Sequence, residues 1–165
     1  MKFSYRLARL CGSVHDGGNV VFATTADNEE LLFSAVGNRI TVFELTRHSS
    51  YTLPVECRSD VYRMAVNRAS TQLLAIDCEG RAVVINIARR IGVHRFNFKG
   101  LVRDVKYSPD DRWIAVTLGA RLQIWRAPGQ RHDLTPFVLH NTLAGHSVYL
   151  FNNNYSLLIL RNIFF

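Results

Sequence analysis

Long apolar runs are missing from the sequence, since none exceeds the four residues found at Leu157 to Leu160, far too few to cross a bilayer. The first ten residues place Lys2, Arg6 and Arg9 among apolar side chains, so they hold no continuous apolar segment of the secretory-signal type. We therefore expect neither a secretory leader nor a membrane partner.

Cysteine is scarce as well. Cys11, Cys57 and Cys78 are odd in number and lie 46 and 21 residues apart, a pattern that indicates neither a disulfide framework nor a zinc knuckle. None of the six histidines belongs to an H-x-x-x-H pair. We predict no metal site and no cofactor, and we interpret the cysteines as idle thiols in a reducing compartment.

Signals of catalysis are also lacking. No helical periodicity of useful length is present, which excludes most nucleotide-binding architectures. The pair Gly17-Gly18 lacks the lysine and the following helix of a phosphate-binding loop, so we interpret it as a turn between strands. His132-Asp133 could act as a general-base pair, but without a nucleophile motif an exposed polar turn is the better interpretation.

The acidic pairs Glu29-Glu30 and Asp110-Asp111 fall in turns between expected strands, where carboxylates are common. The sequence therefore predicts no catalytic residue, no enzyme activity and no small-molecule substrate.

Lysine is rare among the cations, since 17 of the 20 Lys and Arg residues are arginine. The net charge of +7 is uneven: residues 1–82 carry nine basic and nine acidic side chains, whereas residues 83–165 carry eleven and four. The planar guanidinium fork suits phosphate and carboxylate groups. This balance favours RNA or an acidic protein as partner, and a basic solubilising surface is the alternative.

What the sequence does contain is a repeat. Residues 31–45, 73–87 and 113–127 align without gaps, each as two short apolar strands around a turn. The expected two-residue turns are Gly37-Asn38, Glu79-Gly80 and Gly119-Ala120, where glycine supplies a positive φ, and an arginine follows each turn, at Arg39, Arg81 and Arg121. Another strand precedes each hairpin, at residues 20–25, 61–66 and 102–108, and a more polar fourth strand follows around residues 51–55, 93–99 and 137–143.

Four antiparallel strands per unit, repeated about every 41 residues, are typical of a propeller blade. We predict an all-β fold of WD-repeat-like β-propeller blades, about three complete and one partial, in an incomplete ring. The tandem blades would occupy residues 1–146, with repeats near 20–60, 61–101 and 102–144. Residues 147–165 would form a partial fourth blade or a divergent C-terminal tail.

The repeats resemble those of WD-repeat propellers through Trp125 at the end of a hairpin, the turn Ser108-Pro109-Asp110-Asp111, and Gly145-His146 at the start of a fourth unit. Phe43 and Ile85 take the place of the signature tryptophan, and Arg126 follows Trp125 where aspartate is usual. The resemblance implies structural roles for Gly37, Phe43, Gly80, Ile85, Trp125, Gly145 and His146.

Over residues 1 to about 146, four stretches resemble the amino-terminal blades of the periodic tryptophan protein 2 family: residues 1–6, 36–43, 94–100 and 127–129. The resemblance implies a nucleolar WD-repeat scaffold of the small-subunit processome, which helps join the small nucleolar RNA particle to pre-ribosomal RNA during early 18S maturation. It implies other proteins of a pre-ribosomal complex as partners, and pre-rRNA or small nucleolar RNA as further candidates.

The resemblance fades after His146, although the family continues into further blades, so we expect a truncated form of a larger protein. Three and a half blades would be marginal alone, because a propeller hides its end blades by closing its ring. The last ten residues, SLLILRNIFF, would then form an exposed apolar edge prone to aggregation.

The strongest candidates for partner contact are basic residues near the aromatic residues Phe96, Phe98 and Tyr107; they are Arg89, Arg90, Arg95, Lys99, Arg103 and Lys106. Cations on loops and blade edges can hold phosphates while aromatic rings stack on bases. Arg89 and Arg90 directly follow a strand, so we expect loop positions with free guanidinium groups. The alternative is a solvated blade rim over core aromatics, with His94 packing beside Phe96 and Phe98.

The sequence therefore favours a non-catalytic interaction scaffold. The alternative function is a stand-alone β-rich module that binds another protein and has no role in ribosome assembly.

Overall fold

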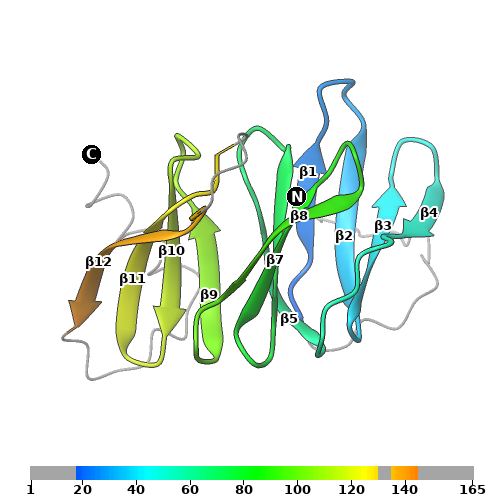
Figure 1. The fold of residues 1–165 in the computed structure, drawn as a ribbon. Coiled ribbons are helices and arrows are strands. Elements are labelled where there is room, and N and C mark those ends of the chain that lie inside the picture. The colour runs from blue at the N-terminus through cyan, green and yellow to red at the C-terminus, as the bar shows by residue number, and fades with distance from the viewer. Residues whose placement is uncertain (1–17, 130–134, 145–165) are drawn as a thin grey trace, which may run out of the picture.

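A computed structural model describes residues 18–129 and 135–144 of the chain. These residues form twelve strands in three four-stranded antiparallel sheets, and none of them is helical (Figure 1). Accordingly, no helix in the described part could span a membrane. The structure confirms the all-β prediction.

Each sheet is a meander, in which neighbours along the chain are neighbours in the sheet. Blade 1 contains β1 (Val21–Thr24), β2 (Glu30–Val36), β3 (Arg39–Glu44) and β4 (Ser49–Thr52). Blade 2 contains β5 (Val61–Val66), β6 (Gln72–Asp77), β7 (Arg81–Asn86) and β8 (Ile91–Asn97). Blade 3 contains β9 (Val102–Tyr107), β10 (Trp113–Leu118), β11 (Arg121–Arg126) and β12 (Val138–Ala144).

One blade falls within each predicted repeat range, whereas residues 147–165 lie outside the described residues. The starts of the fourth strands differ from the prediction by one to two residues, since β4 and β8 begin two residues early and β12 begins one late, and β4 ends three residues early. The turns before β4 and β8 explain the early starts. They end at His48 and Arg90, whose φ angles of 57° and 58° are unusual for residues other than glycine.

The hairpin turns at Gly37 and Gly119 contain two residues, as predicted, and both glycines have positive φ angles, 59° and 57°. The prediction is wrong for the hairpin of blade 2. Three residues, Cys78, Glu79 and Gly80, separate β6 from β7. Asp77 stabilises this longer turn, because its Oδ1 accepts hydrogen bonds from the backbone N–H groups of Glu79 (2.9 Å) and Arg81 (2.8 Å).

The blades stand side by side in chain order, with β1, β5 and β9 as their inner strands (Figure 1). β5 contacts β1 on one side and β9 on the other. β4, β8 and β12 form the outer edges, and their side chains are mostly exposed. This open row of packed sheets is the arrangement expected of consecutive blades in an incomplete propeller.

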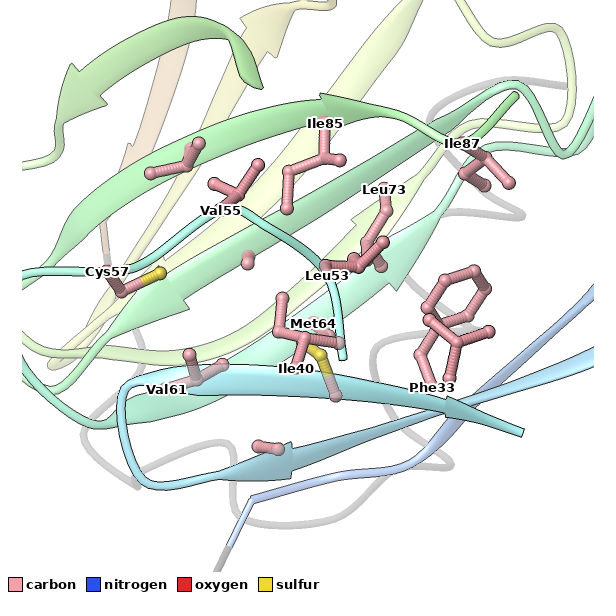
Figure 2. Packing of buried hydrophobic residues seen from close by; sticks show 14 of the residues in the cluster. Phe33, Ile40, Leu53, Val55, Cys57, Val61, Met64, Leu73, Ile85 and Ile87 are labelled. Atoms are coloured by element: carbon pink, nitrogen blue, oxygen red, sulfur yellow. The ribbon is translucent and has the colours of Figure 1, made fainter. Parts of the chain in front are cut away.

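A first apolar core joins blades 1 and 2 (Figure 2). Phe33 and Ile40 from blade 1 pack with Leu73 and Ile85 from blade 2, and all four are at most 1 % exposed. The connector, residues 53–60, runs from β4 to β5 and contributes Leu53, Val55 and Cys57 to the same core. Burying one large aliphatic or aromatic side chain contributes roughly 1.5–3 kcal/mol, so this core holds the two blades together.

A second core joins blades 2 and 3. Four rings meet near the outer edge of these blades, with centroids 4.6–6.0 Å apart; they belong to Phe96, Phe98, Trp125 and Phe137. Edge-to-face pairs at such distances add to the stability gained from buried area. The ring of Trp125 thus anchors blade 3 on blade 2.

Phe43, Ile85 and Trp125, the residues aligned with the signature tryptophan, are each the fifth residue of the third strand of their blade. Phe43 and Ile85 are 7 % and 0 % exposed, and Trp125 is half-buried. Gly145 and His146, the expected start of a fourth unit, lie outside the described residues.

Blade 3 is also fastened to blade 2 by Asp111, which lies in the β9–β10 turn. Its carboxylate accepts hydrogen bonds from the backbone N–H groups of Arg68 (2.7 Å) and Ala69 (3.0 Å) and from Asn67 Nδ2 (3.2 Å). All three donors belong to the β5–β6 loop, so one side chain joins loops from adjacent blades.

Replacing Asp111 by alanine is expected to lower the free energy of unfolding by about 1–3 kcal/mol, because three hydrogen bonds to a carboxylate are lost together. Urea titration followed by tryptophan fluorescence measures the change. Asp27→Ala is the matched control, since Asp27 is an exposed residue of the β1–β2 loop, and it should alter stability by less than about 0.5 kcal/mol. Equal effects of the two substitutions would show that the Asp111 contacts do not tie the blades.

Candidate functional site

The six predicted contact residues do not form one surface. Arg89 and Arg90 precede β8, whereas Lys99 follows it, so they lie at opposite ends of a seven-residue strand, separated by about 20 Å at the usual rise of 3.2–3.4 Å per residue. Arg103 and Lys106 belong to β9, the inner strand of blade 3. Arg95 lies within β8 on the outer edge of blade 2.

Arg90 is in a loop, as predicted, but its guanidinium group is not free. It lies over the Tyr51 ring, 3.9 Å from the ring centroid, and its Nη2 is 3.8 Å from Glu44 Oε1. Tyr51 and Glu44 belong to blade 1, so Arg90 joins the outer parts of two blades. The Arg89 guanidinium makes no hydrogen bond or ion pair with the described residues.

The aromatic residues near these cations are largely structural. Phe98 is only 6 % exposed and packs with Phe96 in the second core, so its ring cannot stack on a base. The Tyr107 hydroxyl is buried, and this burial raises the pKa of Tyr107 well above its usual value. The interpretation of Phe96 and Phe98 as packing residues agrees with these contacts.

A pocket of about 380 Å³ lies beside the first core, where the connector passes over the outer strands of blade 2. Arginines from three segments line it: Arg58 from the connector, Arg81 from β7 and Arg95 from β8. Its other lining residues are Cys57, Asp77, Ala82, Val83, Phe96 and Asn97. We call this site the arginine pocket.

Two buried polar atoms in the wall of the arginine pocket have no hydrogen-bond partner: Asp77 Oδ2 and Arg81 Nη1. Arg81 Nη2 pairs with Glu79 Oε2 at 2.5 Å, and Ser59 Oγ donates to Glu79 Oε1 at 2.7 Å. The hydrogen bond from Ser59 is the largest cause of the lowered pKa of Glu79. Arg58 and Arg95 make no hydrogen bond or ion pair with any described residue, and the positive charge of Arg58 contributes to the lowered pKa of Glu79.

Sequence reasoning found Arg95 but not Arg58, Asp77 or the pocket itself. The arginine after each hairpin turn was visible as a repeated feature, and in blade 2 that residue is Arg81. Arg58 lies at the same pocket only because of the path that the connector takes, and the periodic pattern of the sequence does not predict that path.

The pocket wall also contains Cys57, which is 5 % exposed, and burial raises the pKa of this thiol to about 11. Cys78 is exposed in the β6–β7 turn. At pH 8, iodoacetamide should modify Cys57 at least roughly 100-fold more slowly than Cys78, because Cys57 is buried and its raised pKa keeps the thiol protonated at this pH, whereas Cys78 is exposed.

Peptide mapping of the alkylated chain measures both rates, and denaturation should make them equal. The rate at Cys57 should rise with pH up to its raised pKa. Equal rates in the folded chain would contradict the burial of Cys57.

No group of three His, Cys, Asp or Glu residues among the described ones could hold a metal ion. The interpretation of the acidic pairs as turn residues agrees with the structure for Glu29, Asp110 and Asp111, which lie between strands. It is wrong for Glu30, which is the first residue of β2 and pairs with Thr24 of β1. His132, Asp133 and Gly17 fall outside the described residues.

Three consecutive antiparallel meanders, packed face to face and adjacent through their inner strands, are blades of an incomplete β-propeller of the WD-repeat type. The class of protein is therefore a WD-repeat protein, which generally works by binding other proteins. No protein-family profile matches the chain.

Individual relatives are more informative. The chain is 39 % identical over 148 residues to periodic tryptophan protein 2 homolog of Schizosaccharomyces pombe, covering 88 % of this chain and 17 % of the relative. It is also 39 % identical over 148 residues to periodic tryptophan protein 2 of Saccharomyces cerevisiae, covering 88 % of this chain and 16 % of the relative. The Mus musculus homolog is 37 % identical over 145 residues, with coverages of 88 % and 16 %. Over most of its length, the chain is thus a relative of periodic tryptophan protein 2, and it spans about one sixth of those relatives.

Proposed function

We propose that this chain belongs to a non-catalytic WD-repeat scaffold of the small-subunit processome, which acts in the nucleolus during early 18S rRNA maturation. The observation that carries the proposal is the similarity to periodic tryptophan protein 2 from fungi and mouse over 88 % of the chain. The packed blades support a binding role, because they form a rigid frame that presents loops and outer strands.

The partners that we propose are other proteins of a pre-ribosomal particle. Direct contact with pre-rRNA or small nucleolar RNA stays a prediction for the basic residues with exposed side chains, above all Arg89 and Lys99. Arg90 is a weaker candidate, because its guanidinium group already contacts blade 1.

Sedimentation of a tagged chain from nuclear extract tests this function. We expect the chain to co-sediment with particles that contain 18S precursors and to concentrate in nucleoli when imaged. Contacts between proteins should survive ribonuclease treatment, whereas contacts with RNA should be lost on treatment and weaken steeply as salt is raised.

A chain that stays at the top of the gradient and outside nucleoli would contradict the proposal. If it also bound a protein unrelated to ribosome assembly, the stand-alone interaction module would be the better account.

A further inference from the structure

We propose that the arginine pocket binds an acidic segment of another protein, with a carboxylate held by Arg58 and Arg95 and a neighbouring apolar side chain inside the pocket. This inference rests on the proposed scaffold function and adds to it the chemistry of one partner.

The first step concerns the two exposed arginines at the rim. Arg58 and Arg95 come from different segments, the connector and β8, yet the fold places both at one pocket. Neither guanidinium group makes a hydrogen bond or an ion pair with a described residue, although Arg58 acts on Glu79 through its charge. Guanidinium groups recognise carboxylates through paired N–H donors. The rim is therefore suited to an incoming carboxylate.

The second step concerns the buried wall. Asp77 is 0 % exposed, and its Oδ1 already accepts two hydrogen bonds from the turn, whereas its Oδ2 accepts none. This oxygen is shielded from solvent, so it makes no direct contact with a ligand. The contacts with a ligand are therefore left to the exposed arginines and the apolar side chains of the pocket.

The apolar walls bear on the class of the partner. The Ala82, Val83 and Phe96 side chains line the pocket, and they suit an apolar side chain better than a phosphate or a ribose. A peptide combines an acidic side chain and an apolar side chain in a short segment. The chemistry of this pocket therefore favours protein over nucleic acid.

Glu79 is a carboxylate of this chain that an arginine of the pocket already binds. It pairs with Arg81 Nη2, which belongs to a lining residue of the pocket, and it accepts a hydrogen bond from Ser59. Its negative charge opposes an incoming acidic group. Replacing Glu79 by glutamine should therefore strengthen binding of an acidic peptide.

Fluorescence anisotropy with the purified full chain tests the proposal. The probe is a labelled octapeptide with two Leu-Glu pairs separated by glycine, compared with the same peptide bearing glutamine for glutamate and with an eight-residue oligouridylate. We expect the acidic peptide to bind at least about tenfold more tightly than either other probe, because only it offers carboxylate and apolar groups together.

Matched variants locate the site. The double variant Arg58→Gln, Arg95→Gln should weaken peptide binding at least about tenfold, whereas Arg121→Gln, Arg126→Gln, with the same change of charge on exposed residues of β11, should leave it within about twofold. Circular dichroism checks that each variant folds, and Arg95→Gln alone serves if the double variant does not.

Equal weakening by both double variants would overturn the proposal in favour of a general basic surface. Preference for oligouridylate would overturn it in favour of an RNA site, and absence of peptide binding at millimolar concentration would overturn it outright. None of these outcomes depends on pre-ribosomal particles, so failure here leaves the proposed scaffold function to its own sedimentation test.

Discussion

Replacing Gly80 by alanine is expected to lower the free energy of unfolding by about 3–4 kcal/mol, because two independent costs combine at this turn. Gly80 has a φ of +82°, which a residue with a side chain rarely adopts. An added Cβ would also lie 2.1 Å from the backbone oxygen of Gly100, which cannot move aside as a flexible side chain can. Urea unfolding of the purified chain measures the loss.

Gly119→Ala is the matched control for that experiment. Gly119 also has a positive φ, 57°, but a Cβ there would meet nothing within 4 Å, so only the backbone cost of about 1–2 kcal/mol applies. The two substitutions should differ by at least about 1–2 kcal/mol, the cost of the added contact. Equal losses would mean that the β6–β7 turn does not pack against the β8–β9 loop as the structure shows.

Replacing Phe33 by alanine should cost about 3–5 kcal/mol, the range for deleting a buried phenylalanine ring. Phe33 is 1 % exposed and lies in the core shared by blades 1 and 2 (Figure 2). The loss should appear as a lower urea midpoint with the denaturant dependence unchanged, since both blades unfold together.

Phe22→Ala, on the neighbouring strand β1, is the surface control for Phe33→Ala. Phe22 is 67 % exposed on β1, so Phe22→Ala should change the free energy of unfolding by less than about 0.5 kcal/mol. If Phe33→Ala were equally mild, blades 1 and 2 would not share the core described for them.

The sequence predicted the inner part of each blade well, because its physical signals are strong there. Strand pairs such as β2–β3 and β10–β11 are rich in apolar residues and enclose a glycine turn, and both the strands and the turns lie where expected. The hairpin of blade 2 has the same pattern with one more residue in its turn. Its length depends on the hydrogen bonds made by Asp77, which composition does not reveal.

The outer strands were predicted less accurately for a related reason. β4 and β8 have largely exposed side chains, so they carry little apolar periodicity. Their starts are set by turns that end at His48 and Arg90 in the left-handed region. Because neither residue is glycine, the sequence gives no sign that a turn ends there.

For the candidate site, too, the sequence predicted the residue types but not how the folded chain brings them together. Charge identified Arg89, Arg90 and Arg95, but it could not show that Arg90 stacks on Tyr51 or that Arg95 shares a pocket with Arg58. These relations arise from the packing of blade 1 on blade 2. The arginine pocket is therefore a property of two repeats together.

Hydrogen exchange of the purified chain, read by mass spectrometry, tests the three-blade account most directly. The account predicts slow exchange in β2–β3, β6–β7 and β10–β11, repeating about every 41 residues, with faster exchange in the outer strands β4, β8 and β12, which have one unpaired edge. Uniformly fast exchange, or protection without this period, would contradict it.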